Sequence, residues 1–187
     1  FFQKSKALDQ VNLIIKSGAS IIDIGGESTR PGSKTINDKK EWNRIKEIIK
    51  KVKKKFPKVV ISVDTRKSYV IDKALEVGVN IINDVSGFNY DINSFNIVNS
   101  KKVPLVLNHT QGTPQTMQIN PKYDDVLLDI YDFFEKKIKL LRDIGIKHNN
   151  IILDPGIGFG KNLKHNMNLI RGISIFHSFG FPILVGN

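Results

Sequence analysis

Short apolar runs alternate with longer amphipathic stretches along this chain of 187 residues, and that alternation narrows the folds open to it. The runs at residues 21–24 and 59–63 are almost continuously apolar, which is typical of strands covered on both faces in a parallel sheet. We expect strands at residues 20–24, 59–64, 80–85, 103–109, 150–154 and 181–186, and helices at residues 4–16, 38–55, 67–77, 93–101, 123–144 and 162–179. Repeated strand and helix units of this kind predict the α/β class in one continuous domain.

The polar residues collect at strand ends, and their distribution favours one α/β architecture over another. Five of the six expected strands end in or are followed by polar residues or glycine, among them Asp64, Asn83 and Asp154. An open doubly wound sheet places its ligand at one crevice, where only a couple of strand ends contribute, whereas all carboxyl ends of a barrel face one site. The sequence therefore predicts a TIM-type (β/α)8 barrel, of which these residues supply about six of the eight units.

Asp64, Asn83 and Asp154 occupy matching positions on three expected strands. A single strand-end Asp often does no more than cap the following loop, and an ionised carboxylate there is costly unless it is paired or hydrogen-bonded. Together, however, two carboxylates can accept from ring and exocyclic N–H groups while an amide supplies a further donor or acceptor. This set predicts a site for the edge of a flat heterocycle such as a pterin or a purine.

Two glycine-rich segments differ in what they indicate. Residues 25–32, GGESTRPG, follow an expected strand, and Arg30 offers a fork for a carboxylate or a phosphate, so we expect this loop to bind anions and position a substrate. Residues 156–161 lack the phosphate-loop pattern, because Pro155 and Asn162 stand where it requires Gly and Ser or Thr. The four histidines lack the close spacing of helical metal motifs, and His109, at a strand end, either lines the site or packs beside it.

Composition excludes several function classes. The absence of cysteine excludes disulfides, thiolate zinc sites and a cysteine nucleophile. The net charge of +11 is compatible with nucleic acid or a membrane surface, but its densest runs, at residues 50–55 and 136–139, are almost all lysine with helical periodicity, as on a solvated helix face. No apolar stretch approaches the roughly 18 residues of a membrane span, and the first residues lack signal-peptide features. We expect a cytoplasmic protein that binds neither nucleic acid nor membranes.

Five segments of the chain carry a resemblance to a known family. They are IIDIGGESTRPG at residues 21–32, ISVDT at 61–65, IINDVSG at 81–87, HTQGTPQTMQ at 109–118 and LDPGIGFGK at 153–161. In order and spacing these resemble the motifs of dihydropteroate synthase, over essentially the whole chain. The resemblance implies a pterin-binding TIM-type barrel that condenses 4-aminobenzoate with (7,8-dihydropterin-6-yl)methyl diphosphate, giving 7,8-dihydropteroate and diphosphate in tetrahydrofolate biosynthesis.

The resemblance also assigns roles to individual residues of this sequence. Asp64, Asn83 and Asp154 match residues that hold the pterin, Thr29 and Arg30 match a loop that contacts the diphosphate and the aminobenzoate, and Pro31 and Phe159 match the lining of the aminobenzoate cleft, where sulfonamides compete. Arg30 is the residue expected to be catalytic. No protein nucleophile is implied, because the aniline nitrogen attacks the pterin methylene carbon as diphosphate leaves.

Further expectations follow from the same resemblance. It implies Mg²⁺, held by an Asn that lies outside this chain, no metal ligand within it, and a homodimer for the full-length protein. Residues 1–187 then form one barrel domain that is incomplete at both ends, without the first strand and the segment after the seventh, and we expect this part alone to be inactive, because two parallel sheet edges stay unpaired. Asn108 and Thr110 depart from the family, which usually has methionines there.

Two other functions remain open from the sequence. A methyltetrahydrofolate-binding methyltransferase domain resembles this family in barrel and pterin contacts, but it lacks the loop at residues 27–32. A basic binding module with no catalytic role is the alternative from a different class, and salt-dependent binding to duplex DNA would indicate it.

Overall fold

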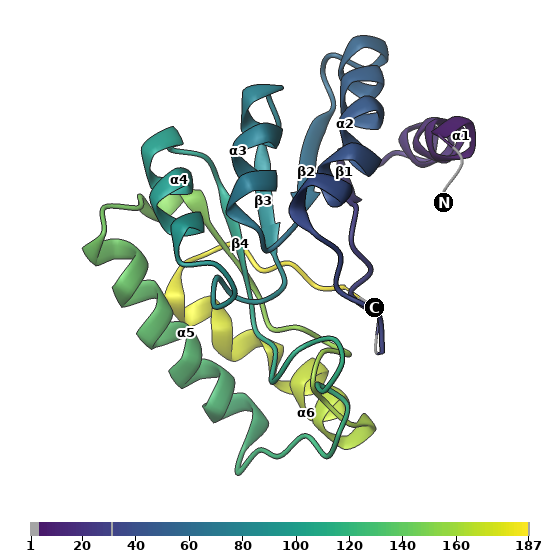
Figure 1. Ribbon diagram of the computed structural model, residues 1–187. Coiled ribbons are helices and arrows are strands. Elements are labelled where there is room, and N and C mark those ends of the chain that lie inside the picture. Colours follow the sequence, from purple (N-terminus) through teal and green to yellow (C-terminus); the bar gives the residue numbers. More distant parts are fainter. Residues whose placement is uncertain (1–3, 31, 187) are drawn as a thin grey trace.

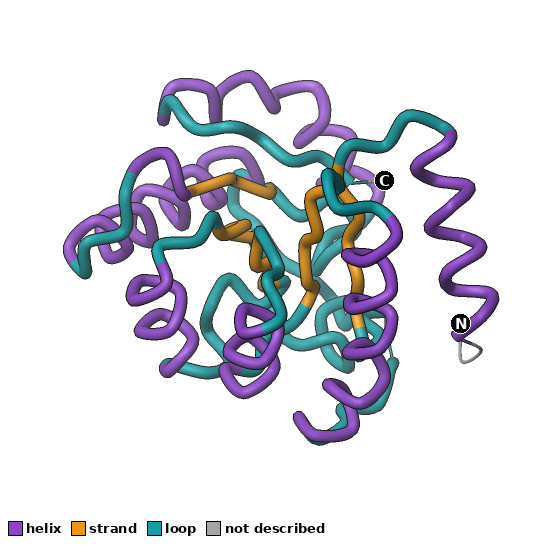
Figure 2. The backbone as a smooth tube through the Cα atoms, turned by 90° about the horizontal axis from the view of Figure 1, so that it is seen from above, coloured by secondary structure: helices purple, strands orange, loops and turns teal. Residues whose placement is uncertain are grey.

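The computed structural model describes residues 4–30 and 32–186, which form a five-stranded parallel sheet in the order β1-β2-β3-β4-β5 (Figure 1). The strands are β1 (Ile21–Gly25), β2 (Val60–Asp64), β3 (Ile81–Asp84), β4 (Leu105–Asn108) and β5 (Ile151–Asp154). The helices are α1 (Lys4–Lys16), α2 (Asp38–Lys55), α3 (Ser68–Glu76), α4 (Asn93–Lys101), α5 (Val126–Asp143) and α6 (Leu163–Gly172), with 3-10 helices η1 (His148–Asn150) and η2 (Ile173–Phe179). Helices lie around the outer side of the sheet (Figure 2), so the chain has the partial barrel fold that the sequence predicts.

Most expected elements form, and one does not. The strand expected at residues 181–186 is reduced to a single parallel bridge between Ile183 and Leu153 on β5. Leu153 N–H donates to Pro182 O at 2.9 Å and Leu184 N–H donates to Leu153 O at 2.8 Å, but Pro182 has no N–H with which to extend the ladder. The expected helix at residues 162–179 is α-helical only to Gly172 and continues as the 3-10 helix η2.

Register and strand alternation sort the side chains between the two faces of the sheet. Asp64 lies opposite Asn83, and Asn108 lies opposite Asp154. Since Asn83 pairs with Val106, two residues before Asn108, all four polar residues share one face, because side chains along a strand alternate between faces. We call this the inner face, since the helices cover the opposite one.

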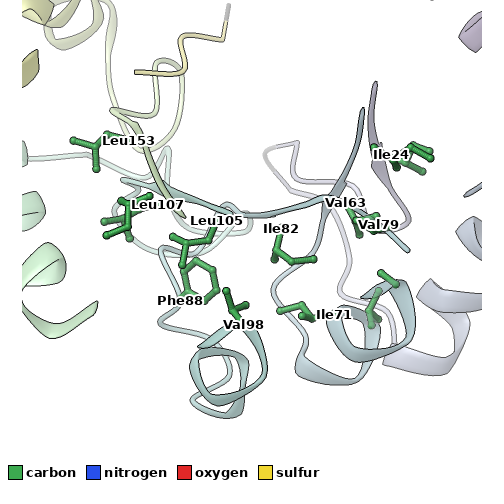
Figure 3. Packing of buried hydrophobic residues seen from close by; sticks show 14 of the residues in the cluster. Ile24, Val63, Ile71, Val79, Ile82, Phe88, Val98, Leu105, Leu107 and Leu153 are labelled. Carbon is green, nitrogen blue, oxygen red and sulfur yellow. The ribbon is translucent and has the colours of Figure 1, made fainter. Parts of the chain in front are cut away.

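The opposite face carries the hydrophobic core. Its strand residues include Val63, Ile82, Leu105 and Leu107. Figure 3 shows Ile71 of α3 below Ile82, and Phe88 and Val98 below Leu105, with Val98 on α4. Farther along the sheet, the fully buried Phe134 of α5 packs edge-on against Phe176 of η2, with ring centroids 5.4 Å apart. This burial of apolar surface fixes the faces, because a slip of one residue in any strand would expose its aliphatic side chains.

The lysine-rich helix α2 buries one side only. Its buried residues are Glu41, Ile45, Ile48, Ile49 and Val52, while Lys50, Lys51, Lys54 and Lys55 are exposed. Within residues 4–30 and 32–186, none of the helices is both long enough and apolar enough to cross a membrane.

Asp84 is an acid on the helix side of the sheet. It lies opposite Leu107 and has no exposed surface. Oδ1 accepts from Ser86 N at 2.8 Å and from Ser86 Oγ at 2.6 Å, whereas Oδ2 has no hydrogen-bond partner among the described residues. Burial raises the pKa of Asp84 to about 6 although the Ser86 hydrogen bonds oppose that rise.

We predict that Asp84→Asn makes the free energy of unfolding less sensitive to rising pH. Below about pH 4 the Asp84 carboxyl is protonated in both the folded and the unfolded chain, whereas between about pH 4 and 6 only the unfolded chain ionises it, so wild-type stability falls. The unfolding free energy of the variant minus that of wild type should therefore rise by about 3 kcal/mol over this interval and level off above it. Urea denaturation at a series of pH values measures it, and a difference that is constant with pH would contradict the account.

Candidate active site

The carboxyl ends of β1, β2 and β3 bring together the first polar group of the inner face. Asn83 Nδ2 donates to Asp23 Oδ2 at 3.1 Å, across the intervening strand that ends in Asp64. Burial raises the pKa of Asp64 well above its usual range, and the negative charges of Asp23 and Asp84 raise it further. A ligand that donates N–H groups to this edge would relieve the repulsion among these acids.

The ends of β4 and β5 form the second polar group. Asp154 Oδ1 accepts from Gly156 N at 2.8 Å, and the Asn108 side chain also donates to the Asp154 carboxylate. Burial raises the pKa of Asp154, while these two hydrogen bonds and the positive charge of Lys161 oppose the rise. The carboxylate is therefore oriented before any ligand binds.

Two acceptors of the inner face have no hydrogen-bond partner among the described residues. Asn83 Oδ1 and Asn108 Oδ1 are buried, and neither accepts a hydrogen bond within the described part of the chain. A buried polar atom left in this way costs about 1–3 kcal/mol, which a hydrogen-bond donor on a ligand would offset. The donor and acceptor set expected from the sequence for Asp64, Asn83 and Asp154 is thus assembled on one face, and Asp23 and Asn108 extend it.

A cavity of about 220 Å³ lies beyond the ends of β2 to β4. Its lining includes Arg66, Tyr90, Thr110, Pro114, Met117 and Phe159. The Arg66 guanidinium lies 4.1 Å from the centre of the Tyr90 ring. An apolar slot with one guanidinium suits a small aromatic carboxylate. Six of the seven residues expected to bind substrate are described, and of these six only Phe159 lines this cavity.

The loop after β1 carries Thr29 and Arg30. Arg30 is exposed, Thr29 is half-buried, and neither lines the cavity of about 220 Å³. Gly32 N donates to Pro114 O at 2.9 Å, which joins this loop to the segment that borders the cavity. Pro31, expected to line the aminobenzoate cleft, lies outside the described residues.

A buried ion network fixes the base of that loop, and the sequence reasoning missed it. Glu27 pairs with Arg66 Nε at 2.9 Å and with Lys67 Nζ at 2.8 Å, and Lys67 also pairs with Glu41 of α2. Burial alone would raise the pKa of Glu27, but the hydrogen bonds from Lys67, Ile36 N and Arg66 outweigh it and hold that pKa below its usual value. The acidic Glu27 within the polar loop at residues 25–32 was the only sequence signal for this network, and its partner Arg66 is 39 residues away.

His109 packs beside the site. Its ring is buried against Phe133, with centroids 4.9 Å apart, and its Nδ1 lies 3.1 Å from Lys161 Nζ. Burial and the neighbouring positive charge lower the pKa of His109 to about 3, so the ring is neutral and accepts from the lysine. The sequence left open whether His109 lines the site or packs beside it, and the structure favours packing beside it.

A larger cavity lies outside the strand ends. It has a volume of about 420 Å³ and lies between the start of α5 and helix α6, where Asp124, Tyr123, Lys164 and Arg171 are among its lining residues. None of the expected substrate-binding residues that the structure describes lines this larger cavity. Volume alone does not make it the active site, because the convergent buried polar groups are at the ends of the strands.

Throughout residues 4–30 and 32–186, no group of three or more His, Cys, Asp or Glu side chains lies close enough to hold a metal ion.

Comparison with known proteins decides the family. The sequence profile described as "Pterin binding enzyme" matches residues 1–187. The chain belongs to the pterin-binding enzyme family. It is 41% identical over 180 residues to the dihydropteroate synthase of Escherichia coli strain K12, covering 96% of this chain and 63% of that protein, and 38% identical over 186 residues to the Haemophilus influenzae dihydropteroate synthase, covering 100% and 67%. The chain thus spans about two thirds of the length of these relatives.

Solved structures of pterin-binding enzymes have the same fold as this chain. The Yersinia pestis dihydropteroate synthase in a sulfonamide complex superposes with a TM-score of 0.94 at 38% identity, covering 98% of this chain and 66% of that one. The Xanthomonas albilineans dihydropteroate synthase with 4-aminobenzoic acid superposes with a TM-score of 0.91 at 31% identity, covering 98% and 64%.

We predict that Glu27→Gln destabilises this pterin-binding enzyme by about 3 kcal/mol, because it removes the carboxylate that pairs with the buried Arg66 and leaves the buried Lys67 with Glu41 only. The matched control is Glu76→Gln, which breaks the more exposed pair with Lys73 and should change stability little. Chemical denaturation of both variants gives the comparison, and equal stabilities for the two would show that the Glu27 network contributes no more than a surface pair.

Proposed function

We propose that the protein carrying this sequence is a dihydropteroate synthase, joining 4-aminobenzoate to (7,8-dihydropterin-6-yl)methyl diphosphate with release of diphosphate. The observation that carries the proposal is the assembly of Asp64, Asn83 and Asp154 on one face. The amide oxygens of Asn83 and of the neighbouring Asn108 have no hydrogen-bond partner among the described residues. Support also comes from relatives named dihydropteroate synthase, whose sequences align with 96% and 100% of this chain.

The pterin half of the proposal rests on the inner face. The ring and amino N–H groups of a pterin would donate to Asp154, which is already oriented by Gly156, and to the Asp64 and Asn83 edge. Binding would favour the ionised form of Asp64, since N–H donors stabilise a carboxylate whose pKa burial has raised.

The aminobenzoate half rests on the cavity beside that face. Phe159 and the guanidinium of Arg66 supply apolar surface and positive charge for an aromatic carboxylate. Thr29 and Arg30 then serve the diphosphate and the aminobenzoate from the loop that Glu27 fixes, and Arg30 stabilises the negative charge of the leaving group. In this reaction the aniline nitrogen attacks the methylene carbon directly, so the protein contributes position and charge rather than a nucleophile.

Three parts of the proposal rest on the resemblance alone, namely Mg²⁺, a homodimer of the full-length protein, and Pro31 as a lining residue of the aminobenzoate cleft. A cytoplasmic location rests on the sequence features described above. None of the steps above depends on any of these four.

We predict that Asp154→Ala and Arg30→Ala of the full-length protein fail at different stages. Asp154→Ala should weaken pterin diphosphate binding about 100-fold or more, because it removes charge-assisted hydrogen bonds. Arg30→Ala should keep pterin affinity within a few fold and instead lower kcat or raise the KM for 4-aminobenzoate about tenfold.

Calorimetry with pterin diphosphate and steady-state kinetics separate the two effects. Asp143→Ala, at an exposed position on α5, is the control and should match wild type in both measurements. Near-normal pterin affinity in Asp154→Ala would show that the pterin site has been wrongly placed.

A further inference from the structure

Lys161 is a buried cation that the proposed chemistry leaves unused. The residue is 3% exposed and ends the loop between β5 and α6. Its Nζ lies 2.8 Å from Gly156 O, 2.9 Å from Phe159 O, 3.3 Å from His109 O and 3.1 Å from His109 Nδ1. An ammonium has three N–H donors, so four such acceptors leave none for a substrate.

The acceptors of Lys161 belong to residues that shape both halves of the site. The Gly156 peptide lies between Lys161 and Asp154, because its N–H donates to Asp154 Oδ1 while its C=O accepts from Lys161. Phe159, whose carbonyl also accepts from Lys161, has its side chain in the aminobenzoate cavity. The same ammonium therefore restrains a carboxylate on the inner face and an aromatic ring in the cavity.

Lys161 also ties this loop to the end of β4. Gly156 has φ +69°, and a Cβ there would lie 2.0 Å from His109 O. At Gly160 a Cβ would lie 2.8 Å from Gln111 N. These close approaches leave no room for side chains at the two glycines. The Lys161 ammonium joins the two segments by donating to Gly156 O and His109 O, in addition to the backbone hydrogen bond from His109 N–H to Asp154 O.

A buried ammonium is a costly way to hold two loops. Taking it out of water costs several kcal/mol, and burial lowers the pKa of Lys161 to about 7. A shape-matched apolar side chain is often as stabilising as a buried charge. What the ammonium adds here is directional hydrogen bonding, three N–H donors shared among three carbonyl oxygens and His109 Nδ1, together with attraction to Asp154.

We propose that Lys161 is the positioning residue of this site, holding Asp154 through the Gly156 peptide and Phe159 through its carbonyl so that both substrates meet preformed contacts. The identity of those substrates rests on the proposed function. That Lys161 joins the two loops is independent of the proposed function.

The test uses the full-length protein with Lys161→Met, which keeps the length of the side chain but removes its donors. Lys164→Met is the matched control, since Lys164 is exposed and lies three residues farther along. The measurements are the Kd for pterin diphosphate, kcat and KM for 4-aminobenzoate, and hydrogen exchange of residues 109–112 and 155–160.

For Lys161→Met we expect a rise of about tenfold in both Kd and KM, larger than the fall in kcat, with faster exchange in both segments. A merely structural lysine would lower the folded fraction, and so kcat, while KM stayed unchanged. Kd and KM within about twofold of wild type, with unchanged exchange, would overturn the proposal.

Two further outcomes are also decisive. If Lys161→Met does not fold, Lys161→Arg decides by the same criteria, because a planar guanidinium cannot address three carbonyls as an ammonium does.

If wild type neither binds pterin diphosphate nor turns over, the proposed function has failed, and exchange alone decides the loop joining. Faster exchange confined to the Lys161 variant supports it, and equal exchange overturns it.

Discussion

The parallel register of the sheet is the constraint on which the rest of the structure depends. It sets Asp64 beside Asn83 and Asn108 beside Asp154, and alternation along each strand turns all four toward the inner face. The same alternation sends Val63, Ile82 and Leu107 into the core beneath the helices. The polar site and the hydrophobic core therefore lie on opposite faces of the same sheet, and a shift of one residue in strand register would disturb both.

The loops that complete the site are held by buried cations. Lys67 joins Glu27 and Glu41 under the loop after β1, and Lys161 joins carbonyls of the loops after β4 and β5. Buried charges add little net stability, but removing one partner is costly, so such contacts specify a single geometry. That suits a reaction without a protein nucleophile, in which catalysis depends on where two substrates are held.

Local patterns allowed much of this to be predicted. The helices at Lys4–Lys16, Asp38–Lys55 and Asn93–Lys101 have the expected bounds, since apolar periodicity is a local property. The strand expected at 181–186 was wrong, because strand formation requires a partner ladder that Pro182 interrupts. The sequence pointed to Asp64, Asn83, Asp154 and Phe159. It did not point to the contact of Glu27 with Arg66 or of Lys161 with His109, because these pairs are 39 and 52 residues apart and only the fold brings them together.

The central claim is that the inner face holds a pterin ring, and a crystal structure of the full-length protein with pterin diphosphate tests it most directly. The account predicts the ring edge within hydrogen-bond distance of the Asp154 carboxylate and of Asn83, at about 2.7–3.2 Å, with the methylene carbon turned toward the cavity that Phe159 lines. A pterin bound instead between α5 and α6, in the cavity beside Tyr123 and Arg171, would contradict it.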